Sequence, residues 1–115
     1  MIAIIFEVTP KSDQRANYLA IAAKLKAVLE RQDGFISVER FESLTTPGKL
    51  LSLSFWRDEE AVMNWRKEEE HRRAQAAGRD RVFADYKLRV ASVIRDYGME
   101  DRAEAPEDSV AILGG

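Results

Sequence analysis

The sequence contains no cysteine and only one histidine among its 115 residues. The absence of cysteine excludes disulfide bonds, thiolate metal ligands and cysteine nucleophiles. One histidine cannot form a zinc site by itself, because such sites take three or four protein ligands. A chain without cysteine also fits a reducing compartment, so we expect the protein in the cytoplasm.

The chain also lacks an excess of positive charge. It has 18 Lys and Arg residues against 20 Asp and Glu residues, a formal net charge of -2. A nucleic-acid-binding protein needs a cationic surplus to neutralise phosphates, so we expect no nucleic-acid partner. The apolar run Met1–Val8 is too short to cross a bilayer and lacks the flanking features of a secretion signal. We therefore expect no membrane partner and interpret this run as a strand.

The length leaves room for one hydrophobic core. With 115 residues, of which 45% are hydrophobic, the sequence predicts a single domain. A domain of this size can hold a ligand pocket only by giving up core volume or by sharing a pocket with a partner subunit. The size therefore favours an oligomer.

The first part of the chain predicts a strand followed by a helix. Met1–Val8 is apolar on both faces of an extended segment. Thr9 and Pro10 are typical of a helix N-cap and first helical residue, and an apolar stripe continues to about Gln32. The stripe consists of Tyr18, Ile21, Ala22, Leu25, Val28 and Leu29.

Three more strands are predicted beyond Gly34, which we expect to end the first helix. Phe35–Ser43 and Leu50–Trp56 are rich in apolar residues, and the turn residues of Thr45–Gly48 join them into a hairpin. The last strand is Tyr86–Tyr97, because its residues alternate between apolar and charged over much of its length.

A second helix is predicted after Asp58, which is typical of an N-cap. Its inward face includes Trp65, but an unbroken helix would then place Glu69 and Arg72 on the same face. We therefore expect a break near Lys67 and a second short helix. The inner stripe of that second helix would be His71, Ala74, Gln75 and Gly78.

The element order predicts an α+β domain with a ferredoxin-like βαββαβ fold and an antiparallel sheet over residues 1–98. Residues 99–115 form a polar tail that we expect to be mobile. The helices would cover one sheet face. The other face cannot be wholly polar, because Met1–Val8 and Leu50–Trp56 are apolar on both sides. We therefore expect a homodimer whose two sheets pack face to face into an α+β barrel.

Three segments resemble the antibiotic biosynthesis monooxygenase family: GFISVERFES, LLSLSFW and WRKEEEHRRAQAAGR. The resemblance covers about Met1–Tyr97. It implies a dimeric α+β barrel with a pocket between helices and sheet. It also implies a cofactor-independent oxygenase that converts a small phenolic or hydroquinone-type aromatic to a quinone. In such chemistry a deprotonated substrate passes an electron to dioxygen, and the protein supplies orientation, proton removal and electrostatics.

The resemblance makes His71 and Trp65 the candidate catalytic residues. His71 could remove a phenolic proton, because its reference pKa lies near neutrality. The alternative is a histidine that only packs or caps a helix end. Trp65 could form a flat wall for an aromatic substrate, although an inward tryptophan is more often part of the core.

Further candidates for substrate binding surround this segment. Gln75 and Arg79 lie near the proposed inner stripe, and Asn64 is next to Trp65 in the sequence. Phe83 and Tyr86 could line the cavity, although strand aromatics usually fill cores. The other arginines here follow three glutamates, so a solvated face with ion pairs is the favoured interpretation for them.

Two alternative functions stay open. Haem-degrading relatives carry an asparagine on strand one and an iron-ligating histidine ten residues beyond the tryptophan. This chain has Gln75 at that spacing from Trp65, with His71 four residues too early, and it has no asparagine in strand one. Haem is therefore the alternative to a cofactor-free enzyme. A non-catalytic dimeric module that binds a small aromatic molecule is the third possibility.

Overall fold

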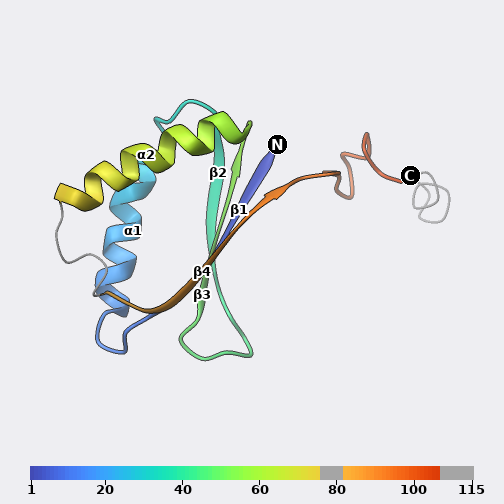
Figure 1. Cartoon of the computed structure of the whole chain (residues 1–115). Helices are drawn as coiled ribbons and strands as arrows, with labels where there is room; N and C mark the ends of the chain where they lie inside the picture. Colours follow the sequence, from blue (N-terminus) through green and yellow to red (C-terminus); the bar gives the residue numbers. More distant parts are fainter. Residues whose placement is uncertain (76–81, 107–115) are drawn as a thin grey trace.

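The computed structural model describes the backbone of residues 1–75 and 82–106 and the side chains of residues 1–69 and 82–106. The elements are β1 (Ile2–Pro10), α1 (Arg15–Leu29), β2 (Phe35–Glu42), β3 (Leu50–Trp56), α2 (Glu59–Gln75) and β4 (Phe83–Ser92). Figure 1 shows both helices on the same side of one sheet. The predicted ferredoxin-like α+β fold is confirmed.

The four strands form one antiparallel sheet in the order β2-β3-β1-β4. The face toward the helices, called the inner face below, carries cross-strand rows of neighbouring side chains. One row is Val38, Ser54, Ile4 and Val90, and the next is Arg40, Ser52, Phe6 and Leu88.

The core lies between the inner face and the two helices. Its larger cluster of buried residues is centred on Trp56, whose exposed fraction is 0%. The other members of this cluster are Ile2, Leu29, Ala61, Val62 and Trp65. A second cluster, near the other end of α1, consists of Val8, Tyr18, Leu50 and Val82. The predicted apolar stripe of the first helix is confirmed, since it supplies residues to both clusters.

The first helix begins later than its sequence predicts. Thr9 and Pro10 continue β1 instead of opening α1, because they pair with Asp85 and Phe83 of β4. Proline is tolerated at this strand end, where the register is already irregular. After a turn the helix starts at Arg15, so tertiary strand pairing overrides the local helix-start signal.

The last strand lies nearer the N-terminus than predicted. β4 begins at Phe83 and ends at Ser92, whereas the sequence pattern suggested Tyr86–Tyr97. The reason is its partner: Ser92 pairs with Ile2 at the start of β1, so no partner strand continues beyond it. The alternation of the strand is as predicted, because Leu88 and Val90 both face the helices.

The predicted break near Lys67 is wrong, because α2 runs without interruption from Glu59 to Gln75. This segment contains neither glycine nor proline and consists mostly of strong helix formers. The start of α2 is as predicted, since the Ala61 backbone N–H donates to Asp58 Oδ1 at 2.9 Å. Local propensity therefore maintains the helix beyond the end of its apolar stripe.

A tight joint connects the loop before β2 to the loop before α2. Gly34 has φ +85°, and an added Cβ would lie 2.5 Å from the Ala61 Cβ, so both backbone conformation and space require glycine. The Arg57 backbone N–H donates to the Gly34 carbonyl at 2.7 Å. The Arg57 guanidinium donates to both carboxylate oxygens of Asp33 at 3.1 and 3.0 Å and to Asp58 at 3.2 Å. We call this cluster the Arg57 joint.

The face of the sheet away from the helices, called the outer face below, is largely apolar around a central ion-pair cluster. In the described part of the chain no helix covers it (Figure 1). Lys49 Nζ lies 2.9 Å from Glu7 Oε1, and Arg89 donates a hydrogen bond to Glu7 Oε2. The apolar residues of this face are Ala3, Ile5, Phe41, Leu51, Leu53, Phe55 and Ala91.

Glu7 is expected to make the fold sensitive to acid. Hydrogen bonds from Lys49 and Arg89 lower the pKa of Glu7 from 4.5 to about 2. Because the folded-state pKa is the lower one, this stabilisation is complete above pH 4.5 and is lost as the pH falls toward about 2. Urea unfolding should show that Glu7→Gln loses less stability than the wild type between neutral pH and a pH midway between those two values.

The control for this prediction is Glu39→Gln. Glu39 is an exposed carboxylate near the same outer face, and among the described side chains of residues 1–69 and 82–106 it makes no ion pair. This variant should keep the wild-type loss of stability in acid. Equal acid sensitivity of Glu7→Gln and the wild type would contradict the role of Glu7.

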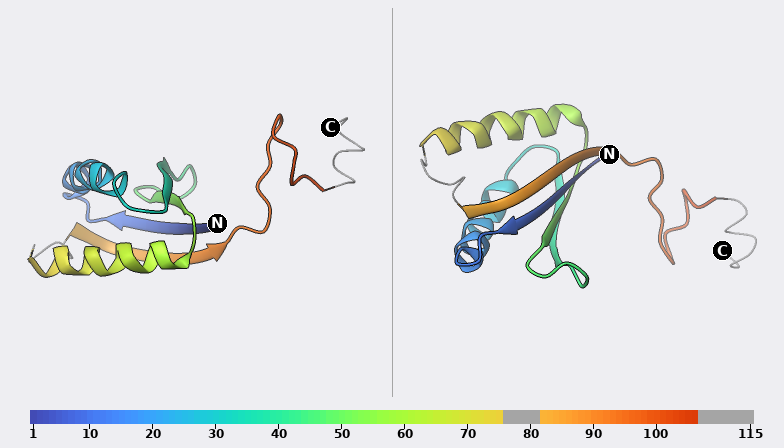
Figure 2. Two further views of the ribbon diagram at one scale, coloured as in Figure 1. Left: turned by 90° about the horizontal axis from the view of Figure 1, so that it is seen from above. Right: turned by 60° about the horizontal axis from the view of Figure 1, so that its bottom comes forward.

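Residues 93–106, the described part of the segment after β4, extend away from the sheet (Figure 2). They contain local contacts, among them the Arg102 guanidinium 5.4 Å from the ring centre of Tyr97. The mobility expected for residues 99–115 stays a prediction. No helix within the described ranges is long and apolar enough to cross a bilayer.

Candidate functional site

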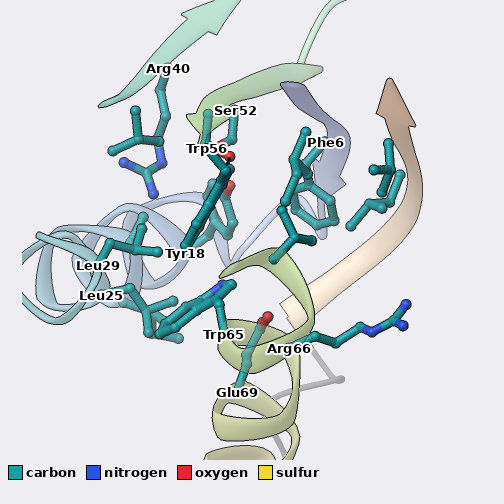
Figure 3. Close-up of a pocket in the computed structure, with 18 of the residues that line it drawn as sticks. Phe6, Tyr18, Leu25, Leu29, Arg40, Ser52, Trp56, Trp65, Arg66 and Glu69 are labelled. Atoms are coloured by element: carbon teal, nitrogen blue, oxygen red, sulfur yellow. Dashed lines mark hydrogen bonds between the residues drawn. The ribbon is translucent and has the colours of Figure 1, made fainter. Parts of the chain in front are cut away.

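A cavity of about 180 Å³ lies between the inner face of the sheet and the two helices (Figure 3). Both helices and all four strands contribute to it. Its apolar walls include Ile4, Phe6, Ile21, Leu25, Val62, Trp65, Leu88 and Val90. An engineered apolar cavity of about 150 Å³ binds benzene, so this cavity has room for a molecule of about one ring.

Aromatic rings form much of the cavity wall. Trp56 of β3 and Trp65 of α2 are stacked, with ring centres 6.3 Å apart and an angle of 27° between the planes. Phe83 meets Tyr18 edge to face at 5.8 Å and Phe6 at 5.9 Å. Flat apolar walls of this kind suit a ring-containing ligand.

Three polar side chains lie on the β2 and β3 side of the cavity: Arg40, Ser52 and Ser54. The Ser54 hydroxyl accepts a hydrogen bond from Trp56 Nε1–H at 3.0 Å, so it has a partner. Ser52 and Arg40 are direct cross-strand neighbours. The Nε of Arg40 is buried and has no hydrogen-bond partner, and Figure 3 shows the guanidinium directed from β2 toward α1 near Leu29.

The uninterrupted helix brings two charged residues to the cavity. Arg66 and Glu69 lie on the turn of α2 beside Trp65 and border the cavity opposite Arg40. In Figure 3 Arg66 extends away from the cavity centre, whereas Arg40 enters the space between sheet and helix. The break expected near Lys67 would have removed Glu69 from this position.

The structure brings only some of the predicted site residues together. Trp65 and Phe83 both line the cavity. Asn64 is exposed and lies outside the lining, because its helical position turns it away from Trp65. Tyr86 is 57% exposed and is not part of the lining, although its ring lies 5.8 Å from Phe6.

Three further candidates fall partly or wholly outside the described part of the chain. The backbone of His71 and Gln75 belongs to α2, but their side chains are not among those described. Arg79 lies in the segment 76–81, outside the described residues. Within the described ranges, no group of three His, Cys, Asp or Glu residues could hold a metal ion.

Sequence reasoning missed Arg40, Ser52, Tyr18 and Glu69 as cavity residues. The signal for Arg40 was present in the alternation of its strand, because Val38 and Arg40 share a face. The cluster of charged residues after Trp65 suggested arginines of that segment instead of Arg40. Glu69 was missed because the helix was expected to break before it.

Comparison with known proteins identifies the family of this site. The family model described as antibiotic biosynthesis monooxygenase matches residues 1–77. A protein of Pyricularia oryzae named jasmonate monooxygenase ABM is 50% identical over 93 residues, which is 81% of this chain. The chain spans 43% of the length of that fungal protein.

Solved structures share the fold at low sequence identity. Rv0793 from Mycobacterium tuberculosis superposes with a TM-score of 0.72 at 18% identity, over 84% of this chain and 98% of that one. A mutant of MhuD with two manganese protoporphyrin IX molecules in each active site superposes with a TM-score of 0.69 at 17% identity, over 85% and 99% of the chains. The family match, the identity to the fungal relative and this fold agree: the chain belongs to the antibiotic biosynthesis monooxygenase family.

Proposed function

We propose that this protein is a cofactor-independent monooxygenase that oxidises a small ring-containing molecule, of phenolic or hydroquinone type, with dioxygen. The observation that carries the proposal is the aromatic cavity between sheet and helices in a chain of this family. Its volume is close to that needed for a single ring, and a porphyrin is several times larger.

The proposed reaction needs no reductant. A phenol and one dioxygen give a quinone and one water, so one oxygen atom enters the product and the other leaves as water. The electrons come from the substrate, whose deprotonation raises its ability to reduce dioxygen. The protein then has to orient the ring, remove the proton and exclude bulk water.

The two proposed catalytic residues, Trp65 and His71, belong to α2. Trp65 holds the ring of the substrate against the stacked Trp56 and fixes its orientation. His71 is proposed as the base, because it is the only histidine in the sequence and its backbone belongs to the same helix as Trp65. Phe83 completes the wall on the β4 side.

The functional unit is proposed to be a homodimer. The outer face presents apolar side chains from the three strands β1, β2 and β3, including Ile5, Leu53 and Phe41, and these residues belong to neither core cluster. A second copy related by a twofold axis could cover this face with the same face of its own sheet.

The test is oxygen consumption, without added reductant, with a panel of phenols and hydroquinones. Turnover of at least one compound is expected, with a loss of about 100-fold or more in His71→Ala. Asn64→Ala is the control, because Asn64 lies outside the cavity. Absence of turnover with all compounds would contradict the enzyme and favour a binding module. A Soret shift on adding hemin would favour the haem alternative instead.

A further inference from the structure

Arg40 is a half-buried arginine without a hydrogen bond or ion pair among the described residues. The Nε of Arg102 is also buried without an acceptor, but the same guanidinium donates to the Gly98 carbonyl at 3.1 Å. Arg15 pairs with Glu42 at 3.2 Å, Arg57 pairs with two aspartates, and Arg89 pairs with Glu7. All of these pairs lie near the surface. Arg40 is more deeply placed, yet it makes no hydrogen bond or ion pair with any residue of the described ranges, and its Nε is buried without an acceptor. The two glutamates nearest to Arg40 in β2 do not pair with it. Glu42 forms an ion pair with Arg15, and the Glu39 side chain belongs to the opposite face of the sheet.

An unpaired buried donor lowers the stability of the fold. A side chain that only covered α1 could be leucine or methionine at no such cost. The unpaired donor is therefore best explained by an acceptor that is absent from the protein alone. Since guanidinium binds carboxylates in a planar fork, the chemistry of that acceptor is anionic.

The position of Arg40 defines the shape of the ligand. The row that begins with Arg40 continues through Ser52 to Phe6 and Leu88, so the inner face changes from polar at β2 to apolar at β4. The Ser52 hydroxyl makes no hydrogen bond within the described part of the chain and could donate to the same anion. The wall of the cavity beside Trp65 is mostly apolar, with Leu25 and Val62 close to the ring and the charged Arg66 and Glu69 at the border on α2.

We propose that Arg40 binds the carboxylate of the substrate. The site would then take a ring-containing carboxylic acid, with its charged end at β2 and its ring against Trp65. The inference rests on the proposed function in treating this ligand as a substrate, but it concerns binding alone. It makes Arg40 a specificity-determining residue, whereas the chemistry is assigned to α2.

The experiment is a binding titration followed by tryptophan fluorescence. Both tryptophans of the chain, Trp56 and Trp65, line the cavity, so a ligand there changes their emission. The probes are jasmonate and its methyl ester, which share a ring and differ in charge. Wild-type protein should bind the acid more tightly than the ester. Arg40→Gln should weaken binding of the acid by about 10- to 100-fold and change binding of the ester by less than about 3-fold.

Two companion variants separate charge from shape. Arg40→Lys should recover part of the affinity for the acid, because it retains the charge but not the planar fork. Arg66→Gln should leave the preference for the acid over the ester in place, because Arg66 extends away from the cavity. Arg40→Gln should unfold at a temperature no lower than the wild type, since it removes an unpaired donor and no hydrogen bond.

Three results would overturn the inference: equal or no binding of acid and ester by the wild type, equal weakening of both in Arg40→Gln, or loss of the preference in Arg66→Gln. Because the titration needs no turnover, it is independent of the oxygen-consumption test. Acid-selective binding without oxygen uptake would contradict the proposed enzyme and leave the Arg40 inference standing. Turnover of neutral phenols without binding of the acid would support the proposed enzyme and contradict the Arg40 inference.

Discussion

Trp56→Ala is expected to lower the free energy of unfolding by about 3–5 kcal/mol, a large part of the stability of a small domain. Trp56 is fully buried and contacts Phe35 and Trp65 through its ring. Its removal leaves a cavity that the surrounding strands cannot fill, and it deprives the buried Ser54 of its hydrogen-bond donor. Both effects lower the free energy of unfolding.

Urea unfolding of the wild type and the variant measures this loss. Met63→Ala is the matched control, because Met63 lies on α2 with 48% of its surface exposed and both residue types are good helix formers. The control should change the stability by no more than about 0.5 kcal/mol. A cost below about 1 kcal/mol for Trp56→Ala would show that the core is not organised around this ring.

Leu53→Glu is expected to convert the proposed dimer to a monomer. Leu53 lies on the outer face between Ile5 and Glu39. In a face-to-face dimer the new carboxylate would be buried without a partner and close to existing negative charge. Such a buried charge costs about 3–5 kcal/mol, so the dissociation constant should rise by at least about 100-fold. The isolated subunit should keep its fold, because its helices pack on the other face.

Light scattering after size exclusion gives the mass directly. The wild type should have twice the 13.1 kDa of the chain, and Leu53→Glu should approach the single value. Leu44→Glu is the control: the same change at a turn residue that is fully exposed should leave the mass at twice the chain value. A wild type with the mass of one chain would contradict the dimer. A Leu53→Glu variant that keeps twice the mass of the chain would contradict it as well.

The fold could be predicted because its strands and helices carry strong periodic patterns. The hairpin of β2 and β3 is marked by turn residues. The apolar stripe of α1 consists of residues that pack in the two core clusters. The boundaries were less predictable because they depend on partners distant in the sequence. Pro10 belongs to a strand only because β4 lies beside it, and β4 ends at Ser92 because β1 begins there.

The candidate site was predictable only in part, since a cavity is built by elements that meet in space. Trp65 was found because an inward tryptophan on a capped helix is visible in the sequence. Arg40 was not, because a charged residue in a half-exposed strand usually faces solvent. Only the register with Ser52 and Phe6, together with the cover provided by α1, turns it into a cavity residue.

The Arg57 joint has a consequence for how a ligand could enter. It ties together the loop that follows α1 and the loop that precedes α2, so the helices are pinned to each other at this end of the sheet. The two helices are therefore held most closely where α1 ends and α2 begins, and we expect a ligand to enter from the opposite end, past Glu69 on α2.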